Sequence, residues 1–126
     1  MKKKLVIGVF ENDSINRFIY KRMVKLQPGK VEAHIFENHE EGIEKVHELK
    51  PDVLFVDLHM HGEYLGGIEW LRAMKLVLPH TRFVAMTTLV QKNDQESAIK
   101  AGFTMCVEKP LPFYDMEKLL KQISNN

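Results

Sequence analysis

The sequence predicts an α/β fold in which a parallel sheet of five strands is covered by five helices. Short β-type runs alternate with helical patterns along the whole chain, which favours parallel strands joined by right-handed crossovers. The nearly unbroken apolar run Val53–Val56 is typical of a strand that is buried on both faces. The length of 126 residues and the hydrophobic content of 44% fit one domain, residues 1–126, with a single core.

Each expected strand is a short β-type run followed by polar or turn-forming residues. The second run alternates apolar and polar side chains, which suits a strand near the edge of the sheet. The expected strands are Lys4–Phe10, Val31–Phe36, Val53–Val56, Thr81–Met86 and Phe103–Val107.

The expected helices show apolar residues at helical spacing, bounded by capping or helix-breaking residues. They are Ser14–Leu26, Asn38–Lys50, Ile68–Leu78, Gln91–Ala101 and Pro112–Ser124. In the first of them we expect Ile15, Phe18, Ile19, Met23 and Leu26 to form the inward face. Gly102 is expected to end the fourth helix as a C-cap.

These elements suit a flavodoxin-like doubly wound sheet with the strand order 2-1-3-4-5. Reactive side chains follow four of the strands: Glu11–Asp13, Asp57, Thr87 and Lys109. Because the carboxyl ends of parallel strands meet at one edge, we expect two acids, a hydroxyl and an ammonium to share a site. Such a set suggests that the site handles a phosphoryl group.

The composition excludes several classes of partner. The formal net charge of +1 argues against nucleic acid, which would favour a basic excess. The apolar stretch behind the basic start ends at Glu11 and is too short for a signal peptide or a membrane span, so we expect a cytoplasmic protein. Cys106 is the only cysteine, which excludes an internal disulfide and a Cys-rich zinc site.

At several motifs the chain resembles the receiver domain of two-component response regulators, over almost its full length. Each motif is weak alone, but their order and spacing together form a strong signal. The matching segments are Glu11–Asn16, Pro51–Asp57, Gly67–Leu71, Val84–Thr87, Ala101-Gly102 and Lys109-Pro110. In the family, the peptide bond after the lysine is often cis, which Lys109-Pro110 allows.

The resemblance implies that Asp57 accepts a phosphoryl group from a histidine of a partner, either a sensor histidine kinase or a phosphotransfer protein. Mg²⁺ would offset the repulsion between the two anions. The implied ligands of Mg²⁺ are Glu11, Asn12, Asp57 and the backbone carbonyl of His59. Lys109 and Thr87 would each bind a phosphoryl oxygen.

The implied output is a change of the surface formed by residues 91–124, which would contact a downstream protein target. A receiver catalyses its own phosphorylation and dephosphorylation, so we do not expect a classified enzyme. Since the sequence ends at Asn126, soon after the last helix, we expect a stand-alone receiver, a phosphate shuttle or an excised domain.

Three features depart from the family pattern. Asn12 stands where a second acidic ligand is usual, which predicts weaker Mg²⁺ binding unless Glu11 or Asp13 compensates. Cys106 replaces the usual aromatic residue, and Phe103 is expected to point to the opposite face and not to replace it. The loop after Asp57 is about two residues longer than the common form.

Other readings remain open. The chain could be a degenerate receiver that binds a partner without phosphorylation, or a small flavodoxin-like enzyme that binds a nucleotide or flavin. The acidic residues after the first strand could simply cap the first helix. A pair of histidines, His59 and His61, could bind zinc or copper, although two loop histidines are weak evidence for a metal site.

Overall fold

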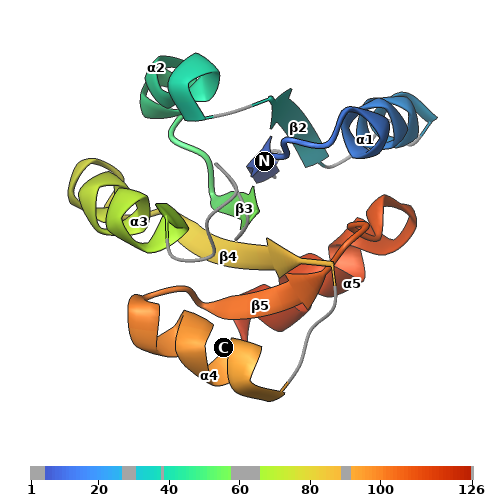
Figure 1. The fold of residues 1–126 in the computed structure, drawn as a ribbon. Helices are drawn as coiled ribbons and strands as arrows, with labels where there is room; N and C mark the ends of the chain where they lie inside the picture. The colour runs from blue at the N-terminus through green and yellow to red at the C-terminus, as the bar shows by residue number, and fades with distance from the viewer. Residues whose placement is uncertain (1–4, 27–30, 38, 58–65, 89–91, 126) are drawn as a thin grey trace.

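A computed structural model describes residues 5–26, 31–37, 39–57, 66–88 and 92–125. They form one parallel sheet flanked by helices (Figure 1). The strands are β1 (Leu5–Phe10), β2 (Val31–Phe36), β3 (Val53–Asp57), β4 (Arg82–Thr87) and β5 (Met105–Glu108). The helices are α1 (Ser14–Leu26), α2 (His39–Leu49), α3 (Gly66–Val77), α4 (Lys92–Ala101) and α5 (Met116–Ser124), and a short 3₁₀ helix, η2 (Phe113–Asp115), precedes α5.

The strand order is β2-β1-β3-β4-β5, which confirms the predicted doubly wound topology. Every neighbouring pair is parallel, so all carboxyl ends lie at the same edge of the sheet. The order reverses between β1 and β3, where open α/β sheets place their ligands. The strand β3 is buried along its whole length, as its apolar sequence predicts.

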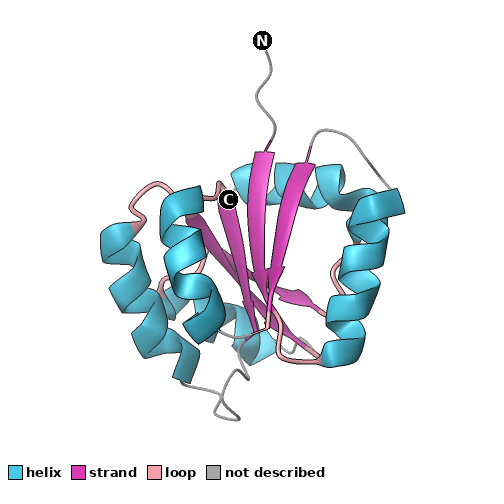
Figure 2. Cartoon of the chain, turned by 90° about the horizontal axis from the view of Figure 1, so that it is seen from above, coloured by secondary structure: helices cyan, strands magenta, loops and turns pink. Residues whose placement is uncertain are grey.

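The helices cover both faces of the sheet (Figure 2). One core cluster packs α2, α3 and α4 against one face, and in it Trp70 makes T-shaped ring contacts with Phe10 and Phe83. The other cluster packs α1 and α5 against the opposite face. No helix among the described residues is both long enough and apolar enough to cross a membrane.

The predicted inward face of α1 is correct only for Met23, which packs partly buried against the core. Ile15 and Phe18 are each 68% exposed and Leu26 is 69% exposed, whereas Tyr20 is fully buried. The burial of Tyr20 orients the helix, because its ring packs 5.2 Å from that of Phe113. An apolar stripe of α1 is therefore left at the surface.

The end of α4 follows the prediction, while the strand after it begins later than expected. Gly102 has a φ of +116°, and its N–H donates to the Ala98 carbonyl, as in a glycine C-cap. Phe103 precedes β5, so strand alternation does not apply to it. Phe103 and Cys106 consequently lie in the same core cluster, and the expectation that they point to opposite faces is wrong.

Candidate functional site

Four side chains converge at the carboxyl edge of the sheet because of where their strands end. Asp57 is the last residue of β3, and Glu11 directly follows β1 beside it. Thr87 is the last residue of β4, and Lys109 directly follows β5. Asp57 and Glu11 are 1% and 0% exposed, so two carboxylates are buried side by side at the topological switch.

Lys109 joins the two carboxylates. Its Nζ lies 2.7 Å from Asp57 Oδ2 and 2.9 Å from Glu11 Oε2, distances typical of charge-assisted hydrogen bonds. These bonds connect residues that are 52 and 98 positions apart in the sequence. The predicted meeting of the acid after β1, the acid at the end of β3 and the lysine after β5 is thus present.

The charges of this group are unevenly compensated. Burial would by itself lower the pKa of Lys109, but the hydrogen bonds to Asp57 and Glu11 outweigh it and raise the pKa above its ordinary value. Burial raises the pKa of Glu11, against the opposing effect of the Lys109 hydrogen bond. In the described part of the site two carboxylates share the Lys109 ammonium, so this pair retains a tendency to bind a further cation.

One atom supports a metal at this position. Glu11 Oε1 is buried and has no hydrogen-bond partner among the described residues. A buried carboxylate oxygen without a partner costs free energy unless a ligand satisfies it. Oxygen atoms of Glu11 and Asp57 are of the kind that Mg²⁺ prefers. The residues present therefore fit a hard divalent cation.

The other two predicted metal ligands, Asn12 and His59, are not part of this buried pair. The side chain of Asn12 is exposed and borders the buried acids. His59 lies outside the described residues, as do His61 and the long loop that contains them. Among the described residues, no group of three or more His, Cys, Asp or Glu side chains is arranged to hold a metal ion. The described residues thus offer two buried carboxylates to a metal ion, those of Glu11 and Asp57.

Asp13 caps α1. Its Oδ1 accepts hydrogen bonds from the backbone N–H groups of Ile15, at 2.8 Å, and Asn16, at 3.1 Å. These backbone hydrogen bonds lower the pKa of Asp13. The reading of the acidic segment as a helix cap therefore holds for Asp13, while Glu11 points into the buried site.

The backbone links the predicted hydroxyl and the predicted ammonium. The N–H of Lys109 donates to the Thr87 carbonyl at 2.8 Å, which ties the ends of β4 and β5 together. The Lys109-Pro110 peptide bond is cis. The side chain of Thr87 is 4% exposed, and among the described residues no hydrogen bond joins its hydroxyl to Asp57 or Lys109. It therefore lies at the same edge without a described hydrogen bond from its hydroxyl to the charged group.

Three supporting residues were missed by the sequence reasoning. The Leu111 N–H donates to the buried Tyr20 hydroxyl at 3.0 Å, which holds the segment after Lys109. The Arg17 guanidinium donates to the Glu11 carbonyl at 3.0 Å. The Gln95 side chain of α4 accepts a hydrogen bond from the Cys106 N–H and donates one to the Cys106 carbonyl. The sequence offered one signal for such supporting contacts: Arg17 and Tyr20 lie in the predicted helix that directly follows the acidic residues Glu11–Asp13.

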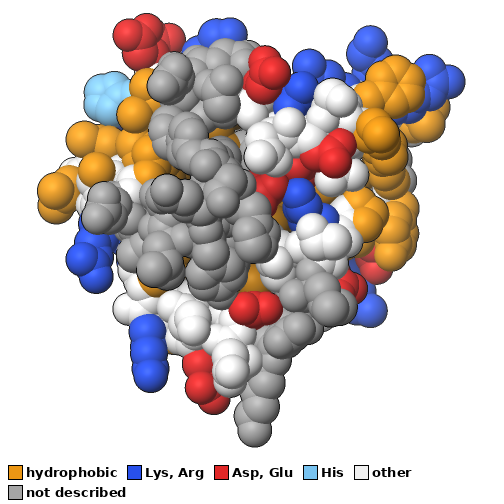
Figure 3. Space-filling view, in the orientation of Figure 1, with side chains coloured by type: hydrophobic (Ala, Val, Ile, Leu, Met, Phe, Trp, Pro, Cys, Tyr) orange, Lys and Arg blue, Asp and Glu red, His pale blue; other side chains and the backbone are white. Residues whose placement is uncertain are grey.

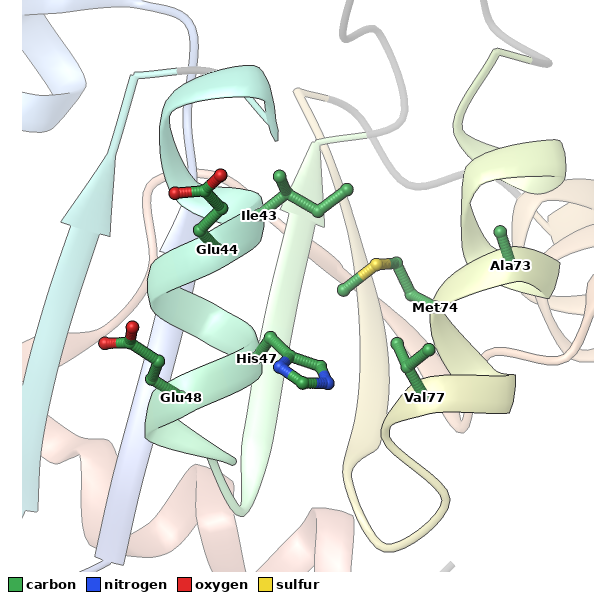
Figure 4. A pocket seen from close by; sticks show the side chains of 7 residues that line it. All are labelled: Ile43, Glu44, His47, Glu48, Ala73, Met74 and Val77. Carbon is green, nitrogen blue, oxygen red and sulfur yellow. The ribbon is translucent and has the colours of Figure 1, made fainter.

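A separate hollow of about 490 Å³ lies between α2 and α3. Figure 4 shows Ile43 and His47 of α2 pointing toward Met74 and Val77 of α3. None of the four site residues lines it, so it does not belong to the carboxyl-edge site.

Comparisons with known proteins place the chain in a family. A sequence profile described as the response regulator receiver domain matches residues 7–124. The chain belongs to the response regulator receiver family. It is 30% identical over 86 residues to the response regulator protein VraR of Staphylococcus saprophyticus, a match that covers 68% of this chain and 40% of VraR. The chain thus spans less than half the length of the curated relatives it matches.

Solved receiver structures share the fold. A response regulator from Thermotoga maritima has a TM-score of 0.76 at 18% identity, covering 98% of this chain and 99% of that one. The signal receiver domain of a DNA-binding response regulator from Colwellia psychrerythraea has a TM-score of 0.73 at 22% identity, covering 98% of this chain and 100% of that one.

A protein-glutamate methylesterase of Myxococcus xanthus is also 30% identical over 112 residues, covering 87% of this chain and 32% of that enzyme. Receivers are in general signalling modules that can be joined to an enzyme, as in that relative.

Proposed function

We propose that this receiver accepts a phosphoryl group on Asp57 from a phosphohistidine of a sensor histidine kinase or phosphotransfer protein. The observation that carries the proposal is the contact of Lys109 Nζ with both Asp57 and Glu11. The proposed nucleophilic oxygen, the lysine ammonium and the proposed metal-binding carboxylate thus belong to one hydrogen-bonded group. Transfer needs these elements together, because positioning and electrostatic stabilisation dominate phosphoryl-transfer catalysis.

In the proposed reaction a carboxylate oxygen of Asp57 forms a bond to phosphorus. The phosphorus–nitrogen bond to the donor histidine breaks, and its electron pair returns to the imidazole. Two unit charges of like sign repel by about 4 kcal/mol at 4 Å when the effective dielectric constant is 20, so the approach of the phosphoryl group requires compensating positive charge. Lys109, 10% exposed and already bonded to Asp57, supplies one such charge.

Bound Mg²⁺ would supply a second positive charge and orient the oxygens of the transferring group. We propose Glu11, Asn12, Asp57 and the backbone carbonyl of His59 as its ligands. The buried and unpartnered Oε1 of Glu11 supports this assignment, as does the position of Asn12 next to it. An amide oxygen at Asn12 carries no charge, so we expect weaker metal binding than a second carboxylate would give.

We further propose that Thr87 bonds a phosphoryl oxygen and that this alters the surface formed by residues 91–124, which contacts a downstream protein. The short backbone bond between Thr87 and Lys109 supports a coupling of β4 to β5. Because Cys106 is small, we expect the contact of Gln95 with the Cys106 backbone to carry the change to α4. The receiver would act by protein contact and not as a classified enzyme.

The exposed apolar stripe of α1 supports a protein as the phosphoryl donor. The helix begins three residues after Glu11, and Ile15 and Phe18 are both 68% exposed near the site. Figure 3 shows hydrophobic side chains gathered along the right-hand side of the molecule, over α1 and below it. An apolar surface beside a charged site suits a docking protein, whereas a small phosphodonor would not need it.

Intact mass measurement after incubation with acetyl phosphate and Mg²⁺ tests the proposal. We expect wild type and the control Asp115→Asn, an exposed aspartate in η2, to gain the mass of one phosphoryl group. Asp57→Asn should gain none. Failure of wild type to gain mass with acetyl phosphate and with a phosphorylated donor protein would refute phosphorylation. Equal gain by Asp57→Asn would refute the assignment of the acceptor.

A further inference from the structure

The strand β2 forms an open edge of the sheet. It pairs with β1 on one side, and among the described residues no strand pairs with its other side. The Phe36 carbonyl accepts a 3.0 Å hydrogen bond from Glu11 N–H, so Phe36 directs its backbone toward β1. Since successive residues of a strand alternate in direction, Ala33 and Ile35 direct their N–H and C=O groups to the open edge. Such an edge can pair with another extended segment.

A groove of about 410 Å³ runs along this edge, between α1 and α2. Three lysines line it: Lys21 and Lys25 from α1 and Lys45 from α2. All three are exposed, and none forms an ion pair among the described residues. None of its described lining residues is acidic, and the Glu32 carboxylate next to it is held 2.6 Å from His34 Nε2. Its charge therefore favours an anionic occupant.

The lysines are placed on both faces of the edge. α1 and α2 pack on opposite faces of the sheet, as Figure 2 shows for the two helix layers. Lys21 and Lys25 are four residues apart in a helix, which separates them by about 6 Å along its axis. Alternate side chains of an extended strand are about 6.6 Å apart. One face of an added strand could thus meet Lys21 and Lys25, and its other face Lys45.

We propose that this edge of β2 binds an extended acidic segment of a partner protein by strand addition. Backbone groups of the segment pair with Ala33 and Ile35. Three successive carboxylates meet Lys21, Lys45 and Lys25 in alternation. Nucleic acid fits the groove less well, because phosphates only accept hydrogen bonds and leave the strand's carbonyl groups unpaired. A second copy of this chain would bring three further lysines to the same edge and would be repelled.

This site is distinct from the phosphoryl site. The groove lies along residues 33–36 of the edge strand β2, whereas Asp57 and Lys109 lie at the ends of β3 and β5. The proposed binding does not require phosphorylation, so the unmodified chain is the material for the test. A failure of one proposal leaves the other intact.

The probe is a fluorescein-labelled peptide, Val-Thr-Glu-Glu-Glu-Thr-Val, measured by fluorescence anisotropy with the full chain. The first variant is Lys21→Glu with Lys25→Glu, and the matched control is Lys118→Glu with Lys121→Glu at exposed positions of α5, which changes the net charge equally. A second peptide has proline in place of the first threonine, which keeps all three carboxylates and removes one backbone donor. Amide chemical shifts of Ala33 and Ile35 map the site.

We expect saturable binding, with a loss of at least about fivefold in the groove variant and a change within about twofold in the control, in keeping with partly screened surface charges. The proline peptide should bind at least about fivefold more weakly, and shifts should centre on β2. Equal losses in both charge variants, equal binding of the proline peptide, or shifts elsewhere would overturn the proposal. So would stronger binding of a DNA oligonucleotide of equal charge, or a dimer in sedimentation that the groove variant abolishes.

Discussion

One carboxylate oxygen of Glu11 accepts a 2.9 Å hydrogen bond from Lys109 Nζ, while its other oxygen is buried without a partner among the described residues. Burial raises the pKa of Glu11 from 4.5 despite this bond. A carboxyl group with a raised folded-state pKa binds protons more tightly in the folded state. Folding stability must then fall as the pH rises from the unfolded value of 4.5 through the folded pKa.

The variant Glu11→Gln tests this effect, because its amide still accepts a bond from Lys109 and carries no charge. Without metal, we expect wild type to lose stability relative to Glu11→Gln between pH 4.5 and pH 8, as the raised pKa of Glu11 requires. Each unit of pKa difference corresponds to about 1.4 kcal/mol. Urea unfolding at both pH values measures it. The exposed Glu96→Gln of α4 is the control, and parallel pH profiles of wild type and Glu11→Gln would contradict the expectation.

Asn12→Asp should strengthen metal binding. A second charge beside Glu11 and Asp57 attracts a divalent cation, and we expect a gain of roughly tenfold in Mg²⁺ affinity, about 1.4 kcal/mol. Isothermal titration calorimetry measures the affinity. The control is Asn93→Asp, an equal change at an exposed position of α4. An affinity that stays the same in Asn12→Asp would refute the view that the neutral amide weakens the site.

The fold and the central part of the site followed from the sequence for a simple reason. Alternating elements dictate a parallel sheet, and a parallel sheet brings residues such as Asp57 and Lys109 to one edge whatever their separation in sequence. The side chains between the elements were harder to place. Hydropathy favoured Ile15 and Phe18 as the core of α1, while the hydroxyl of the buried Tyr20 made that residue look less apolar than its environment.

The contact of Gln95 with Cys106 could not be predicted either. The two residues are 11 positions apart, and their approach depends on how α4 returns through Gly102 to β5. The predicted direction of the Phe103 side chain was wrong because it depends on where β5 begins. The strand β5 begins at Met105, two residues later than predicted, so the alternation of side chains does not apply to Phe103, and periodicity rarely fixes the first residue of an element.

Tyr20→Phe should destabilise the protein. It removes the hydroxyl that accepts a 3.0 Å hydrogen bond from Leu111 N–H and leaves that donor buried without a partner. The expected cost is about 1–3 kcal/mol in the free energy of unfolding, measured with urea. Tyr114→Phe is the matched control, because Tyr114 is 72% exposed and should tolerate the change. Equal stability of Tyr20→Phe and wild type would show that the hydroxyl does not hold this segment.

Gln95→Ala should loosen α4 from β5. The Gln95 side chain accepts a 3.0 Å bond from Cys106 N–H and donates to the Cys106 carbonyl, so it satisfies both backbone groups of one residue of the edge strand β5. With alanine, water must replace both bonds, and we expect faster hydrogen exchange at the Cys106 amide and a loss of about 1–2 kcal/mol in unfolding free energy. Gln122→Ala at an exposed position of α5 is the control.

If Gln95 also carries the effect of phosphorylation to α4, then Gln95→Ala will still gain a phosphoryl group on Asp57, but the amide shifts of α4 will no longer change with it. Unaltered shift changes in α4 on phosphorylation of this variant would exclude Gln95 from the coupling.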